Sequence, residues 1–316
     1  MATRLNAQDI LTANEAIDPV FLNSPQYVCE PLSDEIGCRT ILKVETQNPI
    51  RCFKGRGADL LCANADADEL VCASAGNFGQ AVAYACRKRG IGLTILAAEN
   101  ANPLKVERMR KLGANVILNG RDFDTAKLHA RAFAEDRGVR FVEDGFDVET
   151  VIGAGTIGLE LSCVTEPIDF LLVPLGNGAL FNGVSTYVKA TRPETKMIAV
   201  QANGAPAMIE SWRTGHLIEH ESVDTIADGI GVRVPIQQAL DDMDALIDEG
   251  ILVEERSILN AMKMLHRHAG MVVEPAGAVG ISAVLENREV FAGKTVATIV
   301  CGSNLTKEQM TNWLRY

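Results

Sequence analysis

Short apolar runs rich in β-branched residues alternate along the chain with longer stretches whose apolar residues recur at helical spacing. The short runs predict strands at 40–44, 69–73, 92–97, 115–118, 140–143, 169–173, 197–201 and 296–301. The longer stretches predict helices at 54–63, 77–89, 103–111, 122–137, 157–164, 180–191, 257–268 and 276–287. Strands and helices that alternate in this way are typical of parallel sheets with crossover helices. The pattern therefore predicts an α/β fold of open, mostly parallel twisted sheets with helices on both faces.

The stretch 69–143 holds four of these strands and three complete helices in strict alternation, as a small domain would. At roughly 150 residues per domain, a chain of 316 residues corresponds to about two domains. No repeat, low-complexity run or polar linker marks a boundary, so the division rests on the pattern alone.

The net charge narrows the possible partners. With 30 basic and 41 acidic residues the chain carries a formal charge of −11, which repels phosphate backbones and disfavours a general nucleic-acid binder. No apolar run approaches the ~20 residues that a membrane helix needs, and the first residues lack the apolar centre of a signal peptide. We therefore expect a cytoplasmic protein that binds neither nucleic acid nor membranes.

The eight cysteines include no C-x-x-C pair, the close spacing that zinc ribbons and redox motifs need. Without a secretory signal, a chain of this length is expected to keep them as reduced, mostly buried thiols. The five histidines complete no ligand pattern with them. No metal site is predicted.

A G-x-G-x-x-G pattern at Gly153–Gly158 matches the dinucleotide-binding turn when it is taken alone. That turn should follow an apolar strand, and an acidic residue should end the next strand. Here the preceding segment is mostly polar, and Asp169 stands before the next predicted strand rather than after it. The context therefore argues against NAD or FAD.

Three other segments place glycines or a lysine at a predicted helix start. Residues 176–179 (Gly-Asn-Gly-Ala) lie between a strand and a helix, an arrangement that presents backbone N–H groups to a phosphate. Residues 74–80 occupy a second such turn, where Ser74 or Asn77 could cap the helix or bind a carboxylate. Lys54 opens a third helix, where the dipole disfavours an ammonium, so a desolvated amine there could act as a base or form a Schiff base. Each feature alone also fits an ordinary turn, cap or surface lysine.

Six segments in one unbroken order carry a resemblance to a known family. They are Cys-Phe-Lys-Gly-Arg-Gly-Ala at 52–58, Ser-Ala-Gly-Asn-Phe-Gly-Gln at 74–80, Pro-Leu-Gly-Asn-Gly-Ala at 174–179, Ala-Asp-Gly-Ile at 227–230, Glu-Pro-Ala-Gly-Ala at 274–278 and Cys-Gly-Ser-Asn at 301–304. In this combination the chain closely resembles the threonine/serine dehydratase family of pyridoxal-phosphate enzymes, of fold type II (tryptophan synthase β-like). The resemblance implies a large cofactor-binding domain from 1–68 and 148–316, and a small, mobile, substrate-side domain at 69–147. It also implies a homodimer.

The resemblance assigns roles to particular residues. It implies that Lys54 holds pyridoxal 5′-phosphate as a Schiff base and later moves the α-proton of the substrate. The other implied cofactor contacts are Phe53 against the ring, Asn77 on the 3′-oxygen, the backbone of Gly176, Asn177, Gly178 and Ala179 around the phosphate, Glu274 near the ring, and Cys301 or the nearby Ser303 at the pyridine nitrogen. Ser74, Ala75, Gly76 and Asn77 are implied to bind the substrate carboxylate.

The implied reaction is β-elimination of water from L-threonine or L-serine, which gives a 2-oxo acid and ammonia. An alternative is a lyase for another β-substituted amino acid, such as 3-hydroxyaspartate, diaminopropionate or a cysteine derivative. Arg51, beside the lysine segment, would pair with a distal carboxylate of such a substrate, or it is only a solvated charge. Serine racemases of this family carry a second base, a serine, at the position of Ala75, so we expect weak racemisation here. Around Gln201 the chain lacks the carboxylates that bind a divalent cation in some members.

Overall fold

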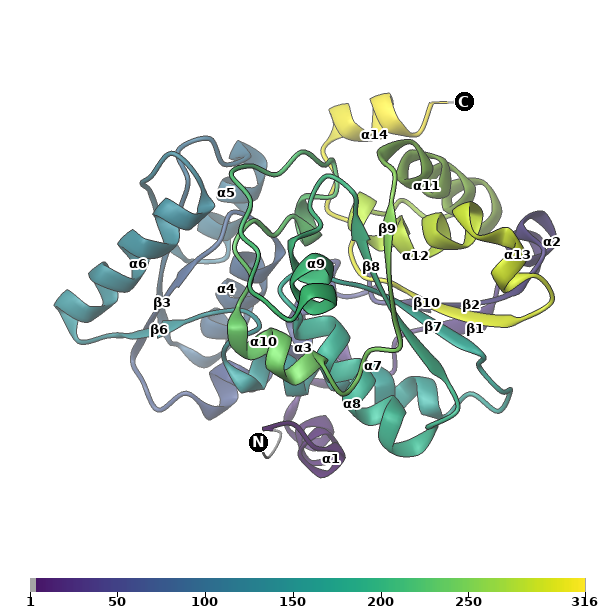
Figure 1. Cartoon of the computed structure of the whole chain (residues 1–316). Coiled ribbons are helices and arrows are strands. Elements are labelled where there is room, and N and C mark those ends of the chain that lie inside the picture. Colours follow the sequence, from purple (N-terminus) through teal and green to yellow (C-terminus); the bar gives the residue numbers. More distant parts are fainter. Residues whose placement is uncertain (1–3, 316) are drawn as a thin grey trace.

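Two sheets organise the computed structural model, which describes residues 4–315 (Figure 1). The larger sheet has the strand order β1-β2-β10-β7-β8-β9, and β1 alone runs antiparallel to its neighbour. Its strands are β1 (Gln26–Val28), β2 (Arg39–Val44), β7 (Phe170–Pro174), β8 (Lys196–Ala202), β9 (Glu249–Val253) and β10 (Thr295–Val300). The smaller sheet is parallel throughout, with the order β5-β4-β3-β6. Its strands are β3 (Glu69–Ala73), β4 (Gly92–Ala97), β5 (Asn115–Leu118) and β6 (Arg140–Val142).

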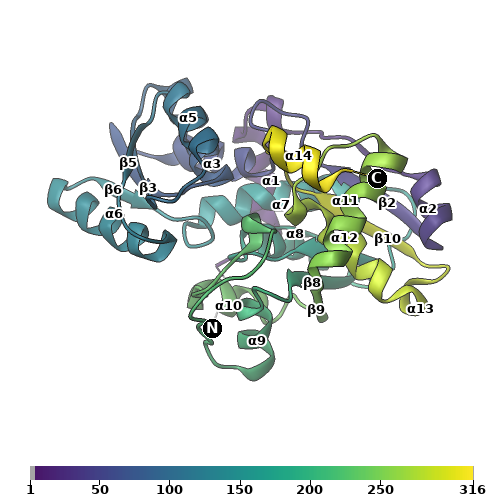
Figure 2. The same cartoon turned by 90° about the horizontal axis from the view of Figure 1, so that it is seen from above.

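Helices surround both sheets, and Figure 2 shows the smaller sheet with its helices standing beside the larger one. In the first half of the chain the helices are α1 (Ala7–Ala16), α2 (Glu30–Ile36), α3 (Lys54–Asn64), α4 (Asn77–Arg89), α5 (Pro103–Lys111), α6 (Phe123–Arg137) and α7 (Val148–Ser162). In the second half they are α8 (Ala179–Thr191), α9 (Ala207–Thr214), α10 (Gln237–Met243), α11 (Glu255–Ala269), α12 (Pro275–Glu286), α13 (Arg288–Phe291) and α14 (Lys307–Trp313). Two short 3₁₀ segments occur at Pro19–Phe21 and Asp228–Ile230.

The alternation of side chains along β3 shows how the smaller sheet is covered on both faces. Leu70 and Cys72 point into a core shared with α3 and α4, whereas Val71 and Ala73 pack against α6. Successive strand residues point to opposite faces, so a sheet covered on both sides needs apolar residues at every position. The same holds for β7, whose residues from Leu171 to Val173 are fully buried. The predicted α/β fold with helices on both faces is thus confirmed.

All eight predicted strands and all eight predicted helices are present, most with boundaries within two residues. The main error concerns the helix predicted at 157–164, which begins at Val148. The pattern missed β1, β9, α1, α2, α9, α10, α13 and α14. Most of these elements are short and lie at a sheet edge or on the surface, where the apolar signal is weak.

The early start of α7 explains the G-x-G-x-x-G pattern, because the pattern lies inside this helix and not in a strand-to-helix turn. A Cβ on Gly153 would lie 2.5 Å from the Cα of Gly57 in α3, and one on Gly158 would lie 2.7 Å from a backbone oxygen of α8. The glycines therefore let α3, α7 and α8 approach each other closely. The argument against a dinucleotide turn is confirmed.

The eight cysteines are all free, and all except Cys163 are buried. The expectation of reduced, mostly buried thiols is confirmed. Within the described part of the chain, no helix is both long and apolar enough to span a bilayer.

Candidate active site

A cavity of about 560 Å³ opens between the two sheets. Part of its wall follows the carboxyl ends of strands: Ser74–Phe78 follow β3, Glu143 and Asp144 follow β6, Asn177 follows β7 and Cys301 follows β10. Ligands of open α/β sheets bind at this end of the strands, where helix N-termini also converge. The site is therefore where the topology of the fold would place a ligand.

Lys54 lies in this cavity as the first residue of α3. Its Nζ forms an ion pair with Asp144 Oδ2, and both side chains are only 13% exposed. The same nitrogen lies 4.5 Å from the centroid of the Phe53 ring. The Asp144 carboxylate is thus the countercharge that lies against this amine at the start of α3. Our sequence reasoning gave Asp144 no role, although its place after the predicted strand 140–143 was a usable signal.

Asn77 and Glu274, which also line the cavity, form a hydrogen-bonded unit with Asn304. Asn77 Nδ2 donates to Glu274 Oε2 at 2.8 Å, and Asn304 Nδ2 donates to Asn77 Oδ1 at 2.9 Å. The backbone N–H of Asn304 donates to Glu274 Oε1 at 2.7 Å. Burial raises the pKa of Glu274, so this carboxyl tends towards its neutral form. Asn304 was part of a matched segment, but its role in orienting Asn77 depends on contacts that only the fold brings together.

Cys301 also lines the cavity, and Ser303 does not. Burial raises the pKa of the Cys301 thiol to about 12, which keeps it neutral. Its carbonyl oxygen accepts a hydrogen bond from the Phe53 N–H at 3.0 Å, which ties β10 to the residue before Lys54. Ser303 instead donates its hydroxyl to the Val272 carbonyl at 2.5 Å. Of the two residues expected at the pyridine nitrogen, only Cys301 faces the cavity.

The turn after β3 presents Ser74, Ala75 and Gly76 to the cavity. The Ser74 hydroxyl oxygen accepts hydrogen bonds from the N–H groups of Gly79, at 2.9 Å, and Gly76, at 3.2 Å. Gly76 is the N-cap of α4 and supplies no side chain to cap it. The remaining N–H groups of this helix start are suited to a carboxylate.

The loop 176–179 runs from β7 into α8, and no side chain caps that helix. Gly178 adopts a φ of +97°, and a Cβ there would lie 3.0 Å from the Cβ of Ala239. A Cβ on Gly176 would lie 3.3 Å from the Gly229 carbonyl oxygen. The Asn177 side chain lines the cavity and donates to Asp144. An uncapped helix start behind a glycine loop fits the phosphate that the sequence predicts here.

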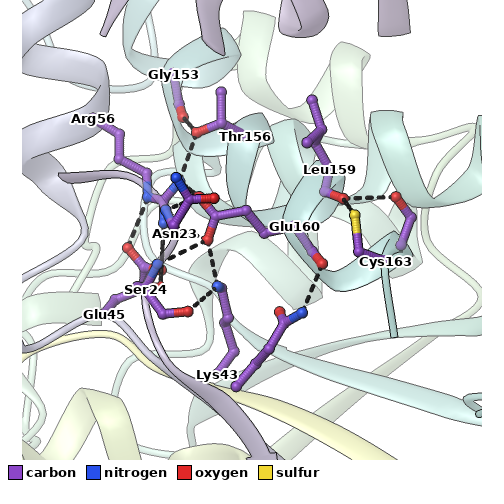
Figure 3. Close-up of polar contacts among 12 residues, drawn as sticks. Asn23, Ser24, Lys43, Glu45, Arg56, Gly153, Thr156, Leu159, Glu160 and Cys163 are labelled. Carbon is purple, nitrogen blue, oxygen red and sulfur yellow. Dashed lines mark hydrogen bonds and ion pairs between the residues drawn. The ribbon is translucent and has the colours of Figure 1, made fainter. Parts of the chain in front are cut away.

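A second polar group is centred on Arg56, two residues after Lys54 in α3 (Figure 3). The Arg56 guanidinium forms paired hydrogen bonds with Glu45, both at 2.8 Å, and with Glu160, at 2.6 and 3.0 Å. Lys43 Nζ also donates to Glu160 and to the Ser24 carbonyl. We call Lys43, Glu45, Arg56 and Glu160 the Arg56 cluster. It joins the start of α3 to β2 and α7, and no local pattern of the sequence predicts it.

Other charged groups of the cavity pair with one another. Lys105 in α5 binds Asp228 at 2.5 Å, and Arg233 binds Asp124 in α6 at 2.6 Å. Both pairs link the smaller-sheet side of the cavity to the segment 228–236. Arg51 is exposed with a φ of +55° and does not line the cavity, so it is a solvated charge. Among the described residues, no three His, Cys, Asp or Glu side chains are grouped as a metal site would need.

The comparisons with known proteins agree with this geometry. The family model described as "Pyridoxal-phosphate dependent enzyme" matches residues 17–302. An L-threonine ammonia-lyase of Thermotoga maritima is 36% identical over 95% of this chain and 76% of its own length. The processed form of threonine deaminase isoform 2 from Solanum lycopersicum superimposes with a TM-score of 0.89 at 30% identity, over 96% of this chain and 85% of that one. Maize serine racemase gives a TM-score of 0.91 at 28% identity, over 98% and 96% of the two chains.

Proposed function

The chain belongs to the family of pyridoxal-phosphate-dependent enzymes, and we propose that it is an ammonia-lyase that eliminates water from L-threonine or L-serine. The observation that carries the proposal is the position of Lys54, a lysine at a helix start inside a cavity that also has an uncapped helix end and a neutral thiol. The similarity to an L-threonine ammonia-lyase and to a threonine deaminase supports the choice of substrate.

The residues of the cavity suit the cofactor. Lys54 Nζ would hold it covalently, with Phe53 against the ring and Asn77 Nδ2 on the 3′-oxygen. The first N–H groups of α8, behind Gly176 to Ala179, would hold its phosphate. Cys301 would face the pyridine nitrogen, and Glu274 would act through Asn77, which it already orients.

Bound pyridoxal phosphate supplies an electron sink for the charge that develops at the substrate Cα. Ser74 and the N–H groups at the start of α4 would bind the substrate carboxylate. Lys54 would take the proton from Cα, and the β-hydroxyl would leave as water. Hydrolysis of the resulting enamine gives a 2-oxo acid and ammonia, with no net oxidation or reduction. The neutral Cys301 thiol would limit the acceptance of charge by the ring, which favours prompt elimination over racemisation.

Ala75 supports elimination over racemisation as well, since it lines the cavity without a group that can carry a proton. The charge of the cavity wall argues against a substrate with a second carboxylate, such as 3-hydroxyaspartate. The acidic residues of the wall are Asp122, Asp124, Glu143, Asp144, Glu221, Asp228 and Glu274. The cations Lys105, Lys127 and Arg233 each bind one of these acids and are not free for a substrate.

Three expectations from the sequence remain part of the proposal. We propose that residues 69–147 move as a small domain over a large domain of 1–68 and 148–316, of which residues 1–3 and 316 lie outside the described part. Closure of this kind would exclude water during the reaction. We also propose a homodimer and a cytoplasmic location. Light scattering after size-exclusion chromatography and cell fractionation test these two points.

The deciding experiment is 2-oxo acid release with added pyridoxal phosphate from L- and D-threonine, L- and D-serine, 3-hydroxyaspartate, diaminopropionate and β-chloroalanine. We expect turnover of L-threonine or L-serine, and little D-serine formed from L-serine. Turnover of β-chloroalanine alone would keep the lysine chemistry but assign another natural substrate. If none of these compounds reacts although the cofactor is bound, the proposed dehydratase activity is wrong.

A further inference from the structure

We propose that Asp144 is a positioning residue for Lys54: its carboxylate, itself held by Asn177, keeps the amine at one place in the cavity until the cofactor arrives. The contact itself is observed, as the ion pair between Lys54 Nζ and Asp144 Oδ2. Its consequence for cofactor capture rests on the proposed function. Neither the family resemblance nor the sequence pattern singles out Asp144.

Asp144 is held in place from the side of the glycine loop. Asn177 Nδ2 donates to both the backbone oxygen and the Oδ2 of Asp144, at 2.7 and 2.6 Å. Oδ2 is thus shared by Lys54 and Asn177, whereas Oδ1 is buried without a hydrogen-bond partner. A carboxylate fixed in this way presents its charge to Lys54 with little freedom to turn away.

The turn that carries Asp144 is itself tightly packed. Gly145 has a φ of +82°, and a Cβ there would lie 2.7 Å from the Asn177 carbonyl oxygen. Its N–H donates to Thr150 Oγ1 at 3.0 Å, and Arg4 donates to its carbonyl oxygen at 3.1 Å. The backbone therefore has no room to carry Asp144 away from Lys54 without breaking these contacts.

The other groups around Lys54 do not replace this charge. Besides Asp144, the thiols of Cys52 and Cys301 interact electrostatically with Lys54, and Glu274 lines the same cavity. Burial raises the pKa of both thiols and of Glu274, so these groups tend to stay neutral. Asp144 is the group whose removal would leave the amine without an anion, at the positive end of α3.

The test is the reactivity of Lys54 in the full-length enzyme after the cofactor has been removed by dialysis. A short pulse of acetic anhydride acylates only neutral amines, and mass spectrometry reads the modified fraction of Lys54 against exposed Lys111 as an internal reference. In Asp144→Asn we expect Lys54 to react about tenfold faster at pH 7, because the amine no longer has to break a charge-assisted hydrogen bond to Asp144 before it reacts. Asp144→Glu restores the charge and should return the rate towards that of the wild type.

Asp122→Asn is the matched control. Asp122 lines the same cavity, but its carboxylate binds Thr125 and not Lys54. This variant should leave Lys54 reactivity unchanged, and thermal melting should show that both asparagine variants fold. An equal Lys54 rate in Asp144→Asn and the wild type would overturn the proposal, and so would an equal increase in Asp122→Asn.

Trapping of pyridoxal phosphate with borohydride separates this inference from the proposed function. In the wild type the reduced cofactor should be found on Lys54, and in Asp144→Asn it should be captured faster at neutral pH. If the cofactor is found on another residue, the proposed function is wrong, whereas the acylation rates still decide the role of Asp144.

Discussion

The first turn of α3 carries two charged side chains that have opposite surroundings. Arg56 is 1% exposed, and its guanidinium binds two carboxylates and two hydroxyl groups. Lys54, two residues earlier, has one anion as its partner and an open cavity in front of it. Buried charges normally persist only when they are fully paired.

The difference lies in which polar atoms remain unsatisfied. Around Arg56 the positive charges of Lys43 and Arg56 are balanced by Glu45 and Glu160, and the cluster holds α3 against β2 and α7. Around Lys54, the Asp144 Oδ1 atom is buried without a partner and α8 begins without a cap. A complete charge network thus stabilises the fold, and the incomplete one beside it is suited to receive a ligand.

The largest expected effect comes from Lys54→Ala. The substitution removes the base that the proposed mechanism assigns to the α-proton, so turnover should fall by at least about 10⁴-fold. Because the Arg56 cluster is untouched, urea unfolding should remain close to that of the wild type. Release of the 2-oxo acid and the unfolding midpoint are the two measurements, with Lys111→Ala as a surface control. Residual turnover within tenfold of the wild type would contradict the role of Lys54.

Arg56→Met, in contrast, should strongly lower the free energy of unfolding. The substitution leaves Glu45 and Glu160 buried with only Lys43 as a countercharge, and breaking a buried pair costs about 3–5 kcal/mol. Urea unfolding measures the loss. Arg39→Ala is the matched control, because the Arg39–Glu166 pair is exposed and should contribute only about 0.2–1 kcal/mol. Equal losses in the two variants would remove the distinction between the cluster and the surface pairs.

The Arg56 cluster should also make the free energy of unfolding depend on pH. Burial raises the pKa of Glu160, but hydrogen bonds and charge interactions with Arg56 and Lys43 outweigh it, so the folded pKa lies below 4.5. A lowered folded pKa stabilises the protein above the unfolded pKa, and this stability is lost as the pH falls from about 5 through the folded pKa. The slope should be measured by urea unfolding from pH 6 to pH 3.

Glu160→Gln is the control for this prediction. It should be less stable than the wild type at pH 6, and the difference between the two should shrink as the pH falls. The raised pKa of Glu274 changes the free energy of unfolding with pH in the opposite direction. Both proteins contain Glu274, so its contribution cancels when they are compared. If the difference in the free energy of unfolding between the two proteins stays constant from pH 6 to pH 3, protonation of Glu160 does not contribute to the loss of stability.

How much could be predicted from the sequence differs between these two regions. The strand and helix that flank Lys54, and the segments that resemble the family, are local patterns, and the structure places Phe53, Lys54, Asn77, Asn177, Glu274 and Cys301 around one cavity. The Arg56 cluster depends on contacts between residues far apart in the chain, such as Arg56 with Glu160. The local pattern of apolar and polar residues does not predict which charged residues far apart in the chain form ion pairs. Asp144 follows a predicted strand, which marks it as a candidate site residue, but that position does not identify Lys54, 90 positions away, as its partner.

The smallest expected effect is that of Cys301→Ser, which tests whether a hydroxyl can replace the thiol in the cavity. A hydroxyl, like the neutral thiol it replaces, can form one weak or ordinary hydrogen bond to a pyridine nitrogen but cannot balance a charge there. A single hydrogen bond is worth about 1 kcal/mol, so kcat/KM for L-threonine or L-serine should change by about fivefold or less. Cys163→Ser, at the exposed cysteine, should change nothing. A loss of several hundredfold at Cys301 would mean that the cavity depends on the sulfur itself. Activity would then depend on the residue at position 301 as strongly as stability is expected to depend on the charges of the Arg56 cluster.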